Sequence, residues 1–141
     1  MNEKYHISTD KSLLDLDMIQ GFLREAYWCV GIPKAVVERS IANSLCFGAY
    51  DESGNQAGFA RVVTDKATFA YLADVFVLEA HRGQGISKMI MEAYTTHPDL
   101  QGLRRHMLAT SDAHGLYKNY GFTPIPEPEM LMMKHDPEVY K

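Results

Sequence analysis

Long apolar runs are missing from this 141-residue sequence. None approaches the ~20 residues that a membrane-spanning helix needs, and Met1–His6 lacks the apolar stretch of a signal peptide. We therefore expect a cytoplasmic protein with no membrane partner.

Cysteine is scarce as well: Cys29 and Cys46 are too few for a disulfide framework and have no Cys or His neighbour at metal-ligand spacing. Free thiols and no bound metal are the expectation.

Basic clusters are also absent. The chain has 14 Lys and Arg against 18 Asp and Glu, a net charge of -4 and a pI near 5.8. Binding to a nucleic-acid backbone needs clustered positive charge, so we expect no nucleic-acid partner. No internal repeat, low-complexity tract or Pro/Ser-rich linker divides the sequence, which predicts one domain over 1–141.

Apolar periodicity and turn residues predict the order of the elements. We expect an edge strand at 5–8, helices from 12 to about 28 and from Pro33, strands at 45–50, 57–63 and 68–78, a helix from 86 to before Pro98, a strand at 106–110 and a short helix at 113–120. The joins between the three central strands are too short for parallel crossovers, whereas the strand–helix–strand run 72–110 is predicted to be a crossover unit. The sequence therefore predicts the α+β class, with a mixed, mostly antiparallel sheet flanked by helices.

A glycine-containing turn, VFVLEAHRGQGISK at 75–88, joins the third central strand to the helix that follows it. A P-loop needs four residues between its glycines, and the dinucleotide fingerprint needs Gly or Ala where this chain has Lys88. The remaining interpretation is an anion site, in which Gly83 and Gly85 allow close approach to the amides of the helix start. Arg82 and Lys88 would add positive charge suited to a pyrophosphate.

The run Arg82–Ser87 resembles the R-G-x-G-[IL]-[GAS] form of the signature of the GNAT superfamily of N-acetyltransferases. The longer signature has Gln or Arg three residues before the first glycine, where this chain has Ala80. The resemblance implies a GNAT fold, acetyl-CoA as cosubstrate and a possible homodimer. It also implies that backbone groups of Val75 and Val77 pair with the pantetheine, and that the pyrophosphate is held by the amides of Arg82, Gly83, Gln84, Gly85, Ile86, Ser87 and Lys88.

Tyr117 is the candidate acid. It lies in 113–122, a segment resembling the part of the family in which a tyrosine faces the cofactor sulfur. A phenol with a pKa near 10 can protonate a departing thiolate. The alternative is a packing role for Tyr117, which is the role expected of Tyr120.

Asp74 interrupts an otherwise apolar strand, so its carboxylate needs a partner. It either accepts a proton or holds a cationic amine, or it caps backbone donors where the strand bends. The segment resembles the Y-L-E-D-[FL]-[FY]-V of polyamine acetyltransferases, but Ala73 replaces the first acidic residue, which argues against polyamine specificity. Four weaker candidates for the base lie on nearby turns: Glu79, His81, Asp112 and His114.

Tyr27 and Trp28 lie in an unusually apolar join, where the resemblance places the acceptor-facing helices. They either wall an acceptor pocket or pack the two helices together. The resemblance implies acetyl transfer to a primary amine of a small molecule or a peptide. Direct transfer is expected rather than a covalent acyl-enzyme, because Cys29 and Cys46 have no evident activating base. Alternatives are a protein lysine or N-terminal acetyltransferase and a non-catalytic acetyl-CoA sensor.

Overall fold

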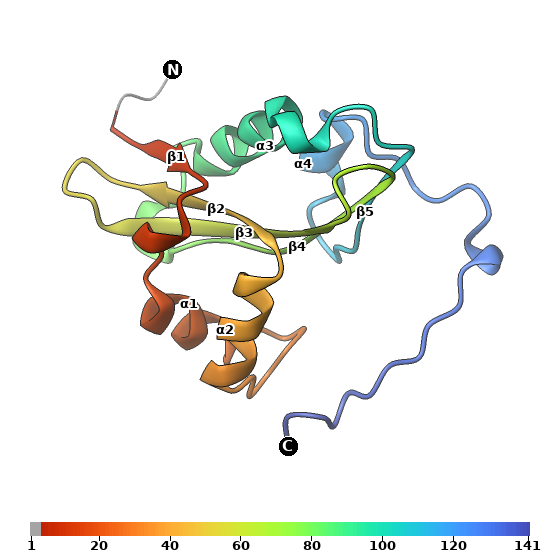
Figure 1. Cartoon of the computed structure of the whole chain (residues 1–141), viewed down its shortest axis with the longest axis horizontal. Helices are drawn as coiled ribbons and strands as arrows, with labels where there is room; N and C mark the ends of the chain where they lie inside the picture. The colour runs from red at the N-terminus through yellow and green to blue at the C-terminus, as the bar shows by residue number, and fades with distance from the viewer. Residues whose placement is uncertain (1–3) are drawn as a thin grey trace.

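A five-stranded sheet forms the centre of the computed structural model, which describes residues 4–141 (Figure 1). Its strands run in chain order: β1 (His6–Ser8), β2 (Leu45–Tyr50), β3 (Gln56–Thr64), β4 (Phe69–Val77) and β5 (Arg105–Leu108). The pairs β1–β2, β2–β3 and β3–β4 are antiparallel, whereas β4 and β5 are parallel. The predicted antiparallel strands and the parallel crossover after them are both confirmed.

Helices cover both faces of this sheet. In Figure 1, α3 (Ile86–Thr96) and α4 (His114–Lys118) lie on one side, and α1 (Leu16–Leu23) and α2 (Lys34–Ala42) on the other. Short 3-10 turns complete the structure at Lys11–Leu13, Glu79–His81, Pro98–Leu100 and Pro128–Met130. The predicted α+β class with flanking helices is confirmed.

The first predicted helix is wrong in its limits. The structure divides 12–28 into a 3-10 turn, the helix α1 and a series of turns after Leu23. Two aspartates cause the division: Asp10 accepts from the Ser12 amide at 2.9 Å and Asp15 from the Met18 amide at 3.1 Å. Such side chains compete with the helical hydrogen bonds and start new helices instead of continuing old ones.

Apolar residues alternate between two cores, one on each face of the sheet. Between the sheet and α3, side chains such as Phe47, Ile90 and Met91 are buried. Opposite them, Phe59 and Phe76 pack with residues of α1 and α2. Both cores hold β4 rigidly, which fixes the strand that carries Asp74.

A bulge in β4 shapes the functional end of the sheet. Asp74 has φ +53, and the pairing with β3 shifts by one residue between Phe59 and Arg61. An extra residue of this kind bends a strand and re-aims its side chains. Beyond Leu72, the last β4 residue paired with β5, the stretch 73–77 has no strand on that side among the described residues. The sheet is therefore open between β4 and β5.

Candidate active site

The glycine turn has the backbone that the sequence predicts for an anion site. Gly83 and Gly85 have φ of +79 and +81, a region in which other residues are strained, and Gly85 is the N-cap of α3. No heavy atom lies within 4 Å of a Cβ built on either residue, so open space faces both. The first amides of any helix have no partner within it, so the start of α3 has donors for an anion.

The side of β4 that has no partner strand begins next to this turn and continues along residues 73–77. The Leu78 amide donates to Ala57 of β3 at 2.8 Å, so by alternation the polar backbone groups of Val75 and Val77 face away from β3. Arg82 Nε donates to the Val77 carbonyl at 3.1 Å, which ties the turn to the end of the strand. The Val77 carbonyl is thus already engaged, while Val75 offers its backbone to an extended ligand.

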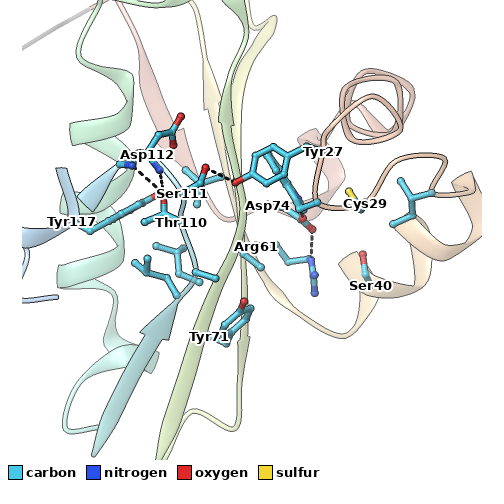
Figure 2. A pocket seen from close by; sticks show the side chains of 18 of the residues that line it. Tyr27, Cys29, Ser40, Arg61, Tyr71, Asp74, Thr110, Ser111, Asp112 and Tyr117 are labelled. Carbon is cyan, nitrogen blue, oxygen red and sulfur yellow. Dashed lines mark hydrogen bonds and ion pairs between the residues drawn. The ribbon is translucent and has the colours of Figure 1, made fainter. Parts of the chain in front are cut away.

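A cavity of about 670 Å³ lies further along the same side of β4 (Figure 2). Its walls come from the join between α1 and α2, from β3 and β4, from the chain after β5, and from Tyr140. Five of the residues predicted for the site line it: Tyr27, Trp28, Asp74, Val75 and Tyr117. Val77 and the turn 82–88 do not line it, and lie beside it at the end of β4.

The carboxylate of Asp74 has the partners that its position demands. Its Oδ2 accepts from Arg61 Nε at 2.8 Å (Figure 2). Its Oδ1 accepts from Trp28 Nε1 at 2.8 Å. Arg61 Nη1 also donates to Ser44 Oγ at 3.2 Å. The pair is well shielded, with side chains 20% and 11% exposed for Arg61 and Asp74. The Asp74 carboxylate holds the Trp28 indole at the cavity wall, so Trp28 both packs against the ion pair and lines the cavity.

Arg61 is a site residue that sequence reasoning missed. The signal was present, because Arg61 is the one charged residue within the apolar strand that pairs with the Asp74 strand. Two opposite charges in adjacent buried strands indicate an ion pair.

Replacement of Arg61 by Met is expected to lower the free energy of unfolding by about 3 kcal/mol, because it leaves a shielded carboxylate without its ion-pair partner. Urea denaturation measures this change. Combining Arg61→Met with Asp74→Asn should restore part of the loss, since the amide keeps an acceptor for Trp28. Additive losses in the double variant would show that the two side chains do not interact energetically.

Tyr117 is placed both as a packing residue and as a cavity residue. It is only 8% exposed, belongs to the core beside α3, and packs edge-on against Phe122 with ring centroids 6.1 Å apart. Burial, and secondarily the Asp112 carboxylate, raises the pKa of its phenol above 10. The group therefore keeps its proton at neutral pH, as a general acid must. Tyr120 is half-buried against the same core, in agreement with its expected packing role.

A hydrogen bond crosses the cavity mouth. Tyr27 Oη lies 3.0 Å from Ser111 Oγ (Figure 2). This contact links the loop between α1 and α2 to the chain that follows β5. Tyr27 is 69% exposed, and its ring meets that of Trp28 edge-on at 5.1 Å. Both aromatic residues line the cavity.

The weaker base candidates are scattered. Asp112 lines the cavity, whereas Glu79, His81 and His114 do not. His81 Nδ1 is instead hydrogen-bonded to Tyr5 Oη at 2.8 Å. Among these four residues, only Asp112 is brought to the cavity with Tyr117.

The cysteines are protected thiols. Burial, together with the nearby Asp74 carboxylate, raises the pKa of Cys29 to about 11, and burial raises that of Cys46 to about 11. Neither thiol ionises appreciably at neutral pH. Within residues 4–141 no three His, Cys, Asp or Glu side chains gather as a metal site would require, and no helix there is long and apolar enough to cross a bilayer.

The mixed sheet opens between β4 and β5, with a glycine turn beside the opening, and this arrangement defines the structural class of the protein. Comparisons with known proteins agree with that class. The model of the acetyltransferase (GNAT) domain matches residues 42–124. A protein of Gibberella zeae assigned as an acetyltransferase is 33% identical, over 83% of this chain and 78% of its own. A crystal structure from Xanthomonas campestris, assigned to GNAT acetyltransferases, is 56% identical with a TM-score of 0.93, covering 96% of each chain. The chain belongs to the GNAT acetyltransferase family.

The fold is shared with more distant structures. One is an acetyltransferase of Clostridium acetobutylicum, assigned as such and crystallised with acetyl-CoA. It is 14% identical, with a TM-score of 0.64 over 94% of each chain. At this identity the likeness concerns the fold alone.

Proposed function

We propose that the protein transfers the acetyl group of acetyl-CoA to a primary amine of a small molecule or a peptide. The observation that carries this proposal is the continuous open side of β4, which runs from the glycine turn past Val75 to the cavity that contains Tyr117. This path suits an extended ligand with an anion at one end and a reactive group at the other. Acetyl-CoA in the Clostridium acetobutylicum protein of the same fold supports the choice of cosubstrate.

In this proposal the pyrophosphate binds at Arg82–Lys88. The amides at the start of α3 donate to its oxygens, and the helix dipole favours its charge. Backbone groups of Val75 pair with the pantetheine like an added strand. The Val77 amide also pairs with the pantetheine. The Val77 carbonyl can do so once the Arg82 side chain leaves it and turns towards the phosphates.

The reaction needs a neutral amine, stabilisation of the charge that develops on the carbonyl oxygen, and a proton for the departing thiolate. Tyr117 supplies that proton, because burial keeps its phenol protonated. The C–S bond breaks as the C–N bond forms, the proton that the amine loses passes to solvent, and the Tyr117 phenolate takes a proton back from solvent. Asp74 serves the acceptor side of the cavity, because its carboxylate, paired with Arg61, fixes the Trp28 indole that lines this side. Tyr27 completes the wall.

Direct transfer in a ternary complex fits the site better than a covalent acyl-enzyme. Of the two thiols only Cys29 lines the cavity, and its pKa of about 11 leaves it protonated. Its Sγ lies 3.3 Å from the Leu23 carbonyl, which is an acceptor for the thiol and not a base. An amine of the acceptor is the better nucleophile.

The hydrogen bond between Tyr27 and Ser111 favours a small acceptor over a protein. It crosses the mouth of the cavity, so a lysine on a folded protein would enter only after this bond opens. A sensor without catalysis would keep the glycine turn but gain nothing from a protonated phenol beside the cavity.

Release of free thiol from acetyl-CoA, followed with a thiol reagent across amines, amino acids, polyamines and lysine peptides, tests the proposal. We expect release that depends on one class of primary amine, with little release for a diamine series because Ala73 removes one acidic residue. Mass spectrometry of the product should show one added acetyl group on nitrogen. Tight acetyl-CoA binding without acceptor-dependent release would favour the sensor.

A further inference from the structure

Tyr140 fastens the far end of the segment 123–141 to the body of the protein. It is half-buried, whereas every other residue of this segment is exposed. Hydrogen bonds within the segment fold its end into turns, and one of them joins the Lys141 amide to the Glu138 carbonyl at 3.0 Å. Aromatic side chains dominate contacts of this kind because they bury a large apolar area. The position of this end of the segment therefore depends on Tyr140.

The loop between α1 and α2 receives Tyr140. The residue packs against the core that contains Ile32 and Val37. A Cβ built on Gly31 would lie 3.3 Å from the Tyr140 carbonyl oxygen, so a side chain at 31 would press against the docked backbone. In Figure 1 the chain beyond α4 swings away from the sheet and returns to this side of the molecule. Glycine at 31 thus allows the close approach of Tyr140.

Tyr140 also lines the cavity that contains Tyr117. The loop between α1 and α2 and the first turns of α2 supply the adjoining wall, here called the acceptor wall: Tyr27, Trp28, Cys29, Ile32, Val36 and Ser40. In Figure 2, Cys29 and Ser40 lie across the cavity from Tyr117. Because Tyr117 protonates the leaving thiolate in the proposed reaction, the body of the acceptor extends towards the acceptor wall and Tyr140.

The acceptor wall carries no charge. Among the described residues that line the cavity, the charged ones are Arg61, Asp74 and Asp112. Arg61 and Asp74 neutralise each other in a shielded ion pair, and Asp112 lies on the chain after β5, as Tyr117 does. The acceptor wall and Tyr140 therefore offer no charged partner to a carboxylate or to a second ammonium group of an acceptor. An apolar body suits such a wall better.

We propose that Tyr140 is a specificity-determining residue, which closes the acceptor wall and restricts the acceptor to a primary amine with a short, uncharged, apolar body. A longer acceptor would have to displace Tyr140 from the core beside α1 and α2, and would lose that buried contact. This inference rests on the proposed acetyl transfer and names the acceptor class that the same cavity takes.

Acceptor length tests the proposal through kcat/KM for straight-chain amines from propylamine to octylamine. An apolar pocket distinguishes acceptors by about 10–200-fold per methylene group. The unchanged full chain should prefer the short amines, and Tyr140→Ala should raise the ratio of octylamine to propylamine at least about 10-fold. Tyr140→Leu, which keeps an apolar side chain in the core, should lie between them, and Tyr140→Phe should keep the original ratio. An unchanged ratio in Tyr140→Ala would overturn the proposal.

Acceptor charge is tested with three amines of equal chain length. The unchanged protein should acetylate butylamine in preference to gamma-aminobutyrate, which adds a carboxylate, and to putrescine, which adds a second ammonium group. A preference for either charged amine would contradict an uncharged acceptor wall. Val139→Ala is the matched control for the segment, because Val139 is 60% exposed and does not line the cavity. This variant should keep both preferences.

Labelling of Cys29 by a bulky maleimide tests the closure without any turnover. Cys29 is half-buried in the acceptor wall, whereas Cys46 is only 1% exposed, so Cys29 is the thiol that reacts in the folded chain. Since access limits the reaction, Tyr140→Ala should speed labelling at least about fivefold and Val139→Ala should not. Circular dichroism confirms that both variants are folded.

The two readouts separate failure of this inference from failure of the proposed function. Faster labelling in Tyr140→Ala without acetylation of any amine would overturn the acetyl transfer and retain the closure by Tyr140. Acetylation with an unchanged length ratio or unchanged labelling in Tyr140→Ala would overturn the role of Tyr140 and retain the acetyl transfer.

Discussion

Gly85→Asp is expected to weaken acetyl-CoA binding at least about 100-fold. Gly85 has φ +81 at the N-cap of α3, and an aspartate there would be strained by about 1–2 kcal/mol. It would also place negative charge at the helix N-terminus, and a like charge ~4 Å away costs about 4 kcal/mol at an effective dielectric constant of 20. Calorimetric titration with acetyl-CoA measures the loss.

Gly54→Asp separates charge at the site from backbone strain. Gly54 has φ +84, similar open space and a position in the turn between β2 and β3, away from the cavity. This control should be destabilised to a similar extent but bind acetyl-CoA as the unchanged protein does. If Gly85→Asp also retained its affinity, the glycine turn would not be the pyrophosphate site.

Tyr117→Phe is expected to lower kcat by about 100-fold or more while leaving the affinity for acetyl-CoA nearly unchanged. Proton transfer by a positioned acid contributes about 10²–10⁴-fold to a rate, and the substitution removes only the hydroxyl. The phenyl ring keeps its packing against Phe122, so the fold should persist. Steady-state kinetics with the best acceptor, together with titration of acetyl-CoA, measures both quantities.

The direction of the Tyr117 pKa predicts a pH profile. Burial raises this pKa above 10, so the phenol remains protonated and able to donate throughout the neutral range. In the unchanged protein, kcat should therefore not fall through loss of this proton within the neutral range, and any such fall should come at a higher pH than for an ordinary tyrosine. Tyr120→Phe, three residues further along and half-buried, is the matched control and should retain kcat. Equal kcat in both variants would leave Tyr117 with a packing role only.

The glycine turn proposed as the anion site could be predicted from the sequence because its signals are local. Two glycines before an amphipathic helix already imply positive φ and free amides at the helix start, and the structure has φ +79 and +81 there. Short joins likewise required the antiparallel strands, and strand–helix–strand order required the parallel β5. The limits of the first helix were missed because Asp10 and Asp15 act as caps within an apolar pattern that continues through them.

The sequence by itself determined the order of the elements along the chain, the glycine turn and the need for a partner at Asp74. Only the tertiary structure decided which residues are that partner. Arg61 and Trp28 lie on other elements, and the bend at Asp74, where φ is positive, directs its carboxylate towards them. The contact between Tyr27 and Ser111 likewise joins residues far apart in sequence. Periodicity and turn chemistry act over a few residues, whereas these contacts depend on how two packed cores orient the elements that carry them.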